Sequence, residues 1–125
     1  MSIASLFMKI GSLYLVFGIC IGVVMSVTGD HSIAPLHAHI NLLGFVLMMV
    51  FGMFYHLFPA AGLSRLAKAH FWLHLLGGLA LLVMLGLLLM GRITEAGMVP
   101  VAPVAELAIL LGILTFVWNV WQHAR

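Results

Sequence analysis

Residues 37–59 read HAHINLLGFVLMMVFGMFYHLFP. This stretch carries no full charge. At about 1.5 Å per residue it is long enough to cross a hydrocarbon core of roughly 30 Å as an α-helix. It opens with two histidines, His37 and His39, separated by one alanine. Because ionisable side chains inside membrane spans are rare and usually functional, these two imidazoles are the first candidates for a site.

The rest of the chain has the same apolar character. Of its 125 residues, 65% are hydrophobic and 6% are charged, whereas a soluble domain averages about 25% charged residues. We therefore expect the lipid bilayer to be its solvent. The net charge of +2 is too small for a nucleic-acid footprint, so no nucleic-acid partner is expected. The single cysteine, Cys20, excludes a disulfide framework within the chain and is expected simply to pack.

Four charge-poor runs have the length of membrane spans. They cover residues 10–28, 37–58, 69–90 and 102–121, and turn-rich segments separate them. The first run lacks a small-residue cleavage site and is longer than the apolar part of a signal peptide, so we expect it to be retained. The sequence predicts an all-α fold, a single integral membrane four-helix bundle over residues 1–125.

The basic residues predict the orientation of this bundle. Lys9, Arg65, Lys68 and Arg125 fall on one side of a four-span topology, and Arg92 falls on the other. Positively charged loops stay on the cytoplasmic side. We therefore expect both termini in the cytoplasm of a bacterial-type inner membrane, with the His37 end of the second helix facing outward.

The spacing of His37 and His39 suits two sites better than one. Residues i and i+2 of an α-helix point about 200° apart, so the two imidazoles cannot easily bind the same metal atom. Neutral imidazole is a common ligand of metals and haem. The alternative is that both histidines are hydrogen-bonded and only cap the helix at the membrane surface.

The same stretch resembles a known family. The motif HAHINLLGF, continuing through residues 51–55 to Pro59, resembles the tenth helix of the catalytic subunit I of haem–copper oxidases. The likeness is strongest to the branch that includes the cytochrome-c oxidases of low-oxygen respiration. AHFWLHLLG, residues 69–77, resembles the start of that family's eleventh helix. The resemblance implies that His37 binds a high-spin haem and His39 a low-spin haem, and that Arg92 holds haem propionates.

The chain departs from this family in size. The oxidase subunit resembles three four-helix units around a pseudo-threefold axis, and this chain resembles one pseudo-repeat unit of that fold. The other low-spin haem ligand and the copper-binding histidines have no counterpart here, and Arg92 lacks a paired arginine. This suggests a homotrimer, in which His37 of one protomer and His39 of the next approach one haem b from opposite sides. Copper is the less favoured cofactor.

Other polar residues are weaker candidates. Asn41, one turn after His37, is a candidate supporting residue at the haem site. Glu106, at a similar expected depth, could orient an imidazole, pair with Arg92 or be protonated. Asp30 and His31 could contact a propionate or a metal, although solvation in a loop explains them as well.

Three further histidines lie near the opposite membrane surface. His56, His70 and His74 could cluster into a metal site. The preferred interpretation places His56 and His70 at the interface and has His74 hydrogen-bonded inside the bundle.

The expected function is that of a membrane b-type haem protein in electron transfer or in redox chemistry of oxygen or nitric oxide. If it is an enzyme, it is an oxidoreductase, but no acid–base pair or nucleophile identifies catalytic residues, and the redox partner is unknown. One alternative is a non-enzymatic copper- or haem-handling protein that uses His31, His37, His39 and methionines. Another is a small structural subunit of a respiratory complex.

Overall fold

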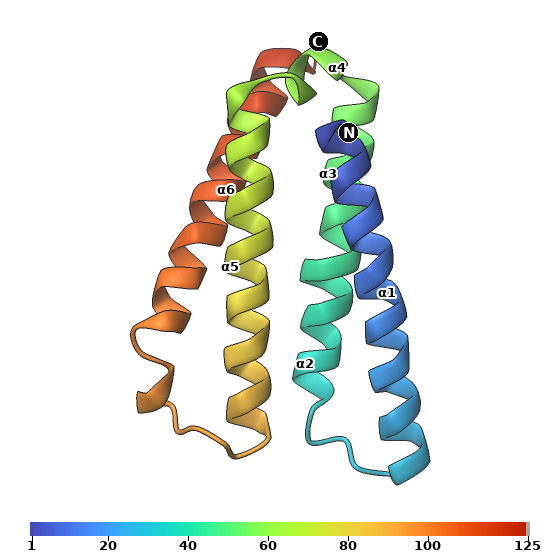
Figure 1. The fold of residues 1–125 in the computed structure, drawn as a ribbon, viewed down its shortest axis with the longest axis vertical. Helices are drawn as coiled ribbons and strands as arrows, with labels where there is room; N and C mark the ends of the chain where they lie inside the picture. The colour runs from blue at the N-terminus through green and yellow to red at the C-terminus, as the bar shows by residue number, and fades with distance from the viewer. Residues whose placement is uncertain (125) are drawn as a thin grey trace.

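The computed structural model describes residues 1–124 as a bundle of long helices (Figure 1). In this part of the chain, four helical stretches are long and apolar enough to cross a membrane, and the second of them is built from three consecutive segments. The elements are α1 (Ile3–Thr28), α2 (Ala34–His39), the π-helix η1 (Ile40–Val46), α3 (Leu47–Leu57), α4 (Pro59–Gly62), α5 (Arg65–Leu89), the 3₁₀ turn η2 (Ala96–Met98) and α6 (Val101–His123). The expected all-helical fold is therefore present, and its four long apolar stretches are compatible with a membrane bundle. The subunit I fold itself stays a prediction.

Two of the spans begin earlier than the apolar runs suggested, because serines cap them. The Ser2 Oγ accepts the N–H of Ser5 at 3.1 Å, and the Ser64 Oγ accepts the N–H of Ala67 at 3.0 Å. Such caps satisfy N–H groups that the first turn of a helix leaves without a partner. The basic residues near these starts consequently lie inside helices, where long side chains can reach toward the membrane surface.

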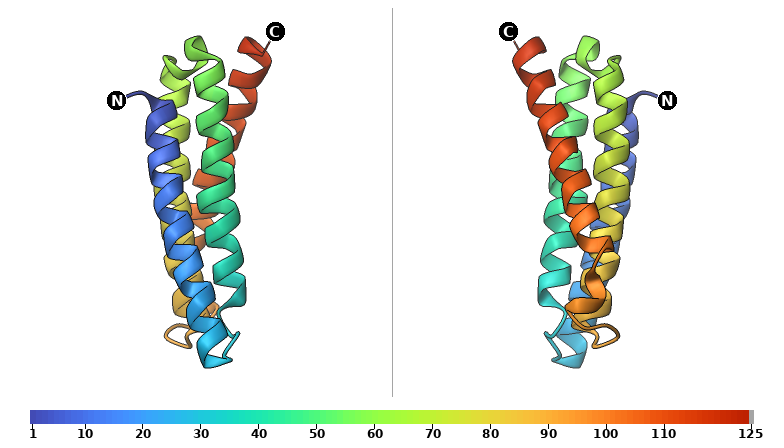
Figure 2. Two further views of the ribbon diagram at one scale, coloured as in Figure 1. Left: turned by 90° about the vertical axis from the view of Figure 1, so that its right-hand side faces the viewer. Right: turned by 90° about the vertical axis from the view of Figure 1, so that its left-hand side faces the viewer.

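The helices form two pairs that a short helix joins at one end. α1 packs along the composite helix α2–η1–α3, and α5 packs along α6 (Figures 1 and 2). The short helix α4 bridges the pairs at the end where α1 begins, which we call the α4 end. The main buried cluster lies there, because its aromatic side chains come from the early turns of α1 and α5 and from α3; among its members are Phe7, Met48, Phe51, Tyr55 and Phe71. Many other large apolar side chains face outward, as expected of a lipid-facing surface.

Glycines allow α1 to approach the composite helix closely. A Cβ on Gly44 would lie 2.5 Å from the ring of Tyr14, and one on Gly52 would lie 2.6 Å from Met8 Cγ. Close helix contact through small residues is the usual way to pack helices in lipid, where apolar burial gives no advantage over lipid itself.

The composite helix contains a local change of hydrogen-bond register. The N–H of Leu47 bonds to the carbonyl of Leu42, five residues back, whereas an α-helix would pair it with Leu43. The Leu43 carbonyl instead lies 2.9 Å from His74 Nε2 on α5. Short π-helical segments of this kind occur often near functional sites. Here the segment begins directly after His39.

Candidate functional site

His37 is held against α1 by its Nδ1 nitrogen. Nδ1 lies 2.8 Å from the carbonyl oxygen of Gly18. Since a carbonyl only accepts, Nδ1 carries the hydrogen, and Nε2 of the neutral ring is left with a lone pair. The Asn41 amide Nδ2 lies 3.3 Å from that Nε2 and donates to it. The half-buried His37 ring fits over α1 because Gly22 has no side chain, and a Cβ on Gly22 would lie 2.9 Å from His37 Cε1. The missing side chain of Gly18 makes room for Asn41.

His39 uses the same nitrogen but lies in a different environment. Its Nδ1 lies 2.7 Å from the carbonyl oxygen of Pro35, four residues back on the same helix. Nδ1 therefore donates, and Nε2 again presents a lone pair. The side chain is exposed on the outer surface of the protomer, among lipid-facing residues such as Leu42 and Val46.

The two imidazoles thus lie on different sides of the composite helix, as the i, i+2 spacing predicts. The side that begins with His37 continues through the buried residues Gly44, Met48, Gly52 and Tyr55. The side that begins with His39 continues through exposed residues, namely Val46, Val50, Met53 and Leu57. The chain therefore presents two separate imidazoles that are not placed to bind one metal atom together.

Two of the other site candidates do not reach these imidazoles within a protomer. The hydrogen-bond partners of His37 and His39 come from α1 and from their own helix. Glu106 is exposed on α6, and Arg92 is exposed in the connection between α5 and α6. The expectation that Glu106 accepts a hydrogen bond from an imidazole is therefore not met inside one protomer.

The loop between α1 and α2 is organised by local hydrogen bonds. An oxygen of the exposed Asp30 carboxylate accepts the N–H of Ser32 at 2.9 Å, and this bond lowers the pKa of Asp30 below its usual value of 3.8. Nδ1 of His31 lies 3.1 Å from the carbonyl of Gly29. These contacts fit the simpler interpretation of a solvated turn.

The histidines of α5 are buried, which corrects the placement of His70 at the interface. His70 is fully buried, and its Nδ1 lies 2.9 Å from the Tyr55 hydroxyl. That hydroxyl also accepts from Asn119 Nδ2 at 3.4 Å, and Ser64 Oγ donates to Asn119 Oδ1 at 3.3 Å. The four side chains connect α3, α5 and α6 at the α4 end.

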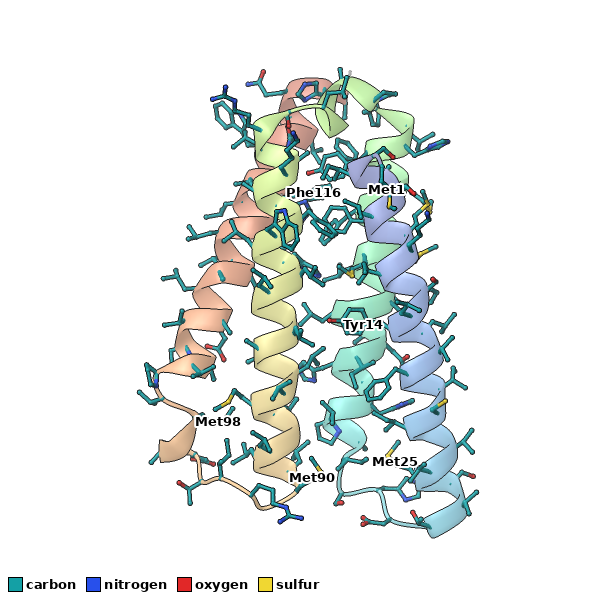
Figure 3. The ribbon with its side chains drawn as sticks, in the orientation of Figure 1. Met1, Tyr14, Met25, Met90, Met98 and Phe116 are labelled. Carbon is teal, nitrogen blue, oxygen red and sulfur yellow. The ribbon has the colours of Figure 1, made fainter. Side chains whose placement is uncertain are left out.

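His74 is hydrogen-bonded inside the bundle, as expected. Its Nε2 donates to the Leu43 carbonyl, and its Nδ1 is buried without a partner, as is His70 Nε2. Phe51 meets both imidazoles edge-on, and Phe116, labelled in Figure 3, stacks obliquely on His70. These rings exclude polar partners from the buried nitrogens.

The alternative metal site on this side is not formed. His56 is exposed and does not join the buried pair. Across residues 1–124, no group of three His, Cys, Asp or Glu side chains is placed to hold a metal ion. Sequence reasoning missed Tyr55 as the partner of His70, and Asn119 as the partner of Tyr55. The one signal available was a polar residue inside each apolar run.

The chain shows no significant similarity to any protein-family model, curated protein or solved structure compared with it. The functional argument therefore depends on the site itself.

Proposed function

We propose that this protein binds haem b in the membrane through the imidazoles of His37 and His39 and acts in electron transfer or in redox chemistry of oxygen or nitric oxide. The observation that carries the proposal is the orientation of His39. Its Nδ1–H is bonded to a backbone carbonyl, while Nε2 keeps a lone pair on a side chain that is exposed among apolar residues.

The donor set fits an axial haem ligand. A metal-binding histidine typically donates its other ring N–H to a carbonyl or carboxylate, which fixes the ring and raises its basicity. Both His37 and His39 have this arrangement, with Gly18 and Pro35 as the acceptors. Haem would supply an iron centre that changes oxidation state, and this chain's part is to hold and orient it in a site that excludes water.

A second protomer would complete the coordination. Since the two Nε2 atoms lie on different sides of one helix, two ligands for one iron would come from two chains. A cyclic trimer, with His39 of one protomer facing His37 of the next, would give the exposed His39 imidazole a partner. In such an assembly Asn41 would have to turn away from His37 Nε2, which it now contacts at 3.3 Å. We further propose that the α4 end, where Arg65 and Lys68 lie, faces the cytoplasm.

The test is an optical spectrum of the protein purified without added cofactor. We expect a Soret band, with sharp α and β bands after reduction if two imidazoles bind the iron. His39→Ala and His37→Ala should each remove or shift these bands. His56→Ala, an exposed histidine at the other end of the same span, is the matched control and should leave them unchanged.

Two outcomes would contradict the proposal. A colourless protein that takes up no haem would exclude haem binding. A haem-bound protein whose native mass is that of a monomer would exclude the trimer while leaving haem binding intact.

A further inference from the structure

The α4 end contains a hollow that lies apart from His37 and His39. It has a volume of about 470 Å³. In Figure 1, α1 begins below the arch formed by α4. The residues around the hollow come from four elements, and they include Ser2, Ala4, His56, Pro59, Leu63 and Lys68.

The charges around this hollow are basic. Lys68 and His56 line it from two different helices, and no lining residue is acidic. The three acidic residues of the chain are all at the other end of the bundle, Asp30 and Glu95 in connections and Glu106 in the second turn of α6. The positive charge of Lys68 therefore has no carboxylate side chain nearby to neutralise it.

The start of α1 adds to this positive character. Ser2 satisfies the N–H groups of Ser5 and Leu6, which leaves the first-turn N–H groups of Ile3 and Ala4 without an intrahelical acceptor. Both residues line the hollow. The N-terminal end of a helix carries a partial positive charge that favours anions.

Exposed apolar side chains lie on the segments that line the hollow. Leu63 at its rim is 83% exposed, and Leu57 and Met53 on α3 are also exposed. A ligand that fits both parts has a negatively charged head and hydrocarbon chains. Basic pockets between membrane helices on the cytoplasmic side bind anionic lipid head groups.

We propose that this hollow binds the phosphate of an anionic phospholipid, with Lys68 as the principal contact and the acyl chains lying along α3. The proposal does not depend on haem binding. It also gives the α4 end a preferred leaflet, the one that is rich in anionic lipid.

The test uses the full chain in nanodiscs that contain equal amounts of phosphatidylglycerol and phosphatidylcholine. Native mass spectrometry then measures which lipid stays on the released protein. The wild type should retain phosphatidylglycerol preferentially, and Lys68→Gln should lower that preference about fivefold, the effect of one basic residue near an anionic membrane surface. Lys68→Arg should preserve it. Arg65→Gln, an exposed cation of the same helix end that does not line the hollow, is the matched control and should also preserve it.

Three results would overturn the proposal. The wild type could show no preference between the lipids. Arg65→Gln could lower the preference as much as Lys68→Gln, which would indicate diffuse attraction by surface charge. Finally, millimolar inorganic phosphate could displace the lipid and itself remain bound, which would identify a site for free phosphate.

Discussion

Replacing Gly44 by alanine should destabilise the bundle, because this glycine sets the distance between α1 and the composite helix. The new Cβ would lie 2.5 Å from Cγ and 2.9 Å from Cβ of Tyr14. Tyr14 Cβ is attached to the α1 backbone, so a rotation of the ring cannot relieve the contact and the helices must separate. Overpacking of this kind costs about 1–3 kcal/mol.

Gly78→Ala on α5 is the matched control. Its new Cβ would meet only the Leu43 side chain, at 3.7 and 3.9 Å, which is ordinary van der Waals contact. Alanine is favoured over glycine in a helix by about 1 kcal/mol. The same gain applies to Gly44→Ala, so it cancels when the two variants are compared. The free energy of unfolding of Gly44→Ala should therefore be lower than that of Gly78→Ala by the overpacking cost, about 1–3 kcal/mol.

The measurement is reversible unfolding in detergent micelles, followed by circular dichroism as the fraction of a denaturing detergent rises. If Gly44→Ala were as stable as Gly78→Ala, or more stable, the inferred close packing at Tyr14 would be wrong.

Two further predictions use the same unfolding assay. Tyr55→Phe should lower the free energy of unfolding by about 1–3 kcal/mol, because the buried side chains of His70 and Asn119 lose their shared hydrogen-bond partner. Tyr14→Phe, the control at a half-buried tyrosine, should stay within about 0.5 kcal/mol of the wild type. Equal effects of the two substitutions would contradict the proposed network. The hydrogen bond from the Ser32 N–H lowers the pKa of the Asp30 carboxyl in the folded state below 3.8. The ionised carboxylate therefore stabilises the fold above pH 3.8, and this contribution is lost as the pH falls through the lowered pKa. Asp30→Asn should remove this part of the acid dependence, and an unchanged pH profile would show that the bond to Ser32 does not contribute.

The four membrane spans could be predicted from the sequence because they depend on local composition and length. The two-sided character of the second span was predictable for the same reason, since the helical period alone decides which residues share a side. The sequence predicted starts for α1 and α5 that lie too late in the chain. Ser2 and Ser64 cap these helices, which therefore begin before Lys9 and Lys68, the charged residues that interrupt the apolar runs.

The contacts between distant polar residues could not be predicted from such local patterns. Tyr55 lies 64 residues before Asn119 and 15 before His70, and only the folded bundle brings them together. The π-helical register was equally hidden, because its effect depends on His74 from another helix donating to the Leu43 carbonyl. A buried histidine and an interfacial one look alike in a sequence of this kind, which explains why the burial of His70 was missed.

Four histidines of the bundle differ in whether a ring nitrogen is free to bind another group; they are His37, His39, His70 and His74. His37 has both nitrogens in contact with protein groups, and His70 and His74 each have one partner and one nitrogen enclosed by the core. His39 alone among these combines a fixed Nδ1 with an exposed Nε2. It is the sixth residue of its span, roughly 7.5 Å along the axis from the first, so either interfacial water or a group from outside the protomer must cover that lone pair. If water covers this nitrogen, the protein should be colourless. If haem iron binds it, the optical spectrum of the haem should disappear when His39 is replaced. For this reason His39, rather than the better-packed His37, is the residue whose substitution decides between the two explanations.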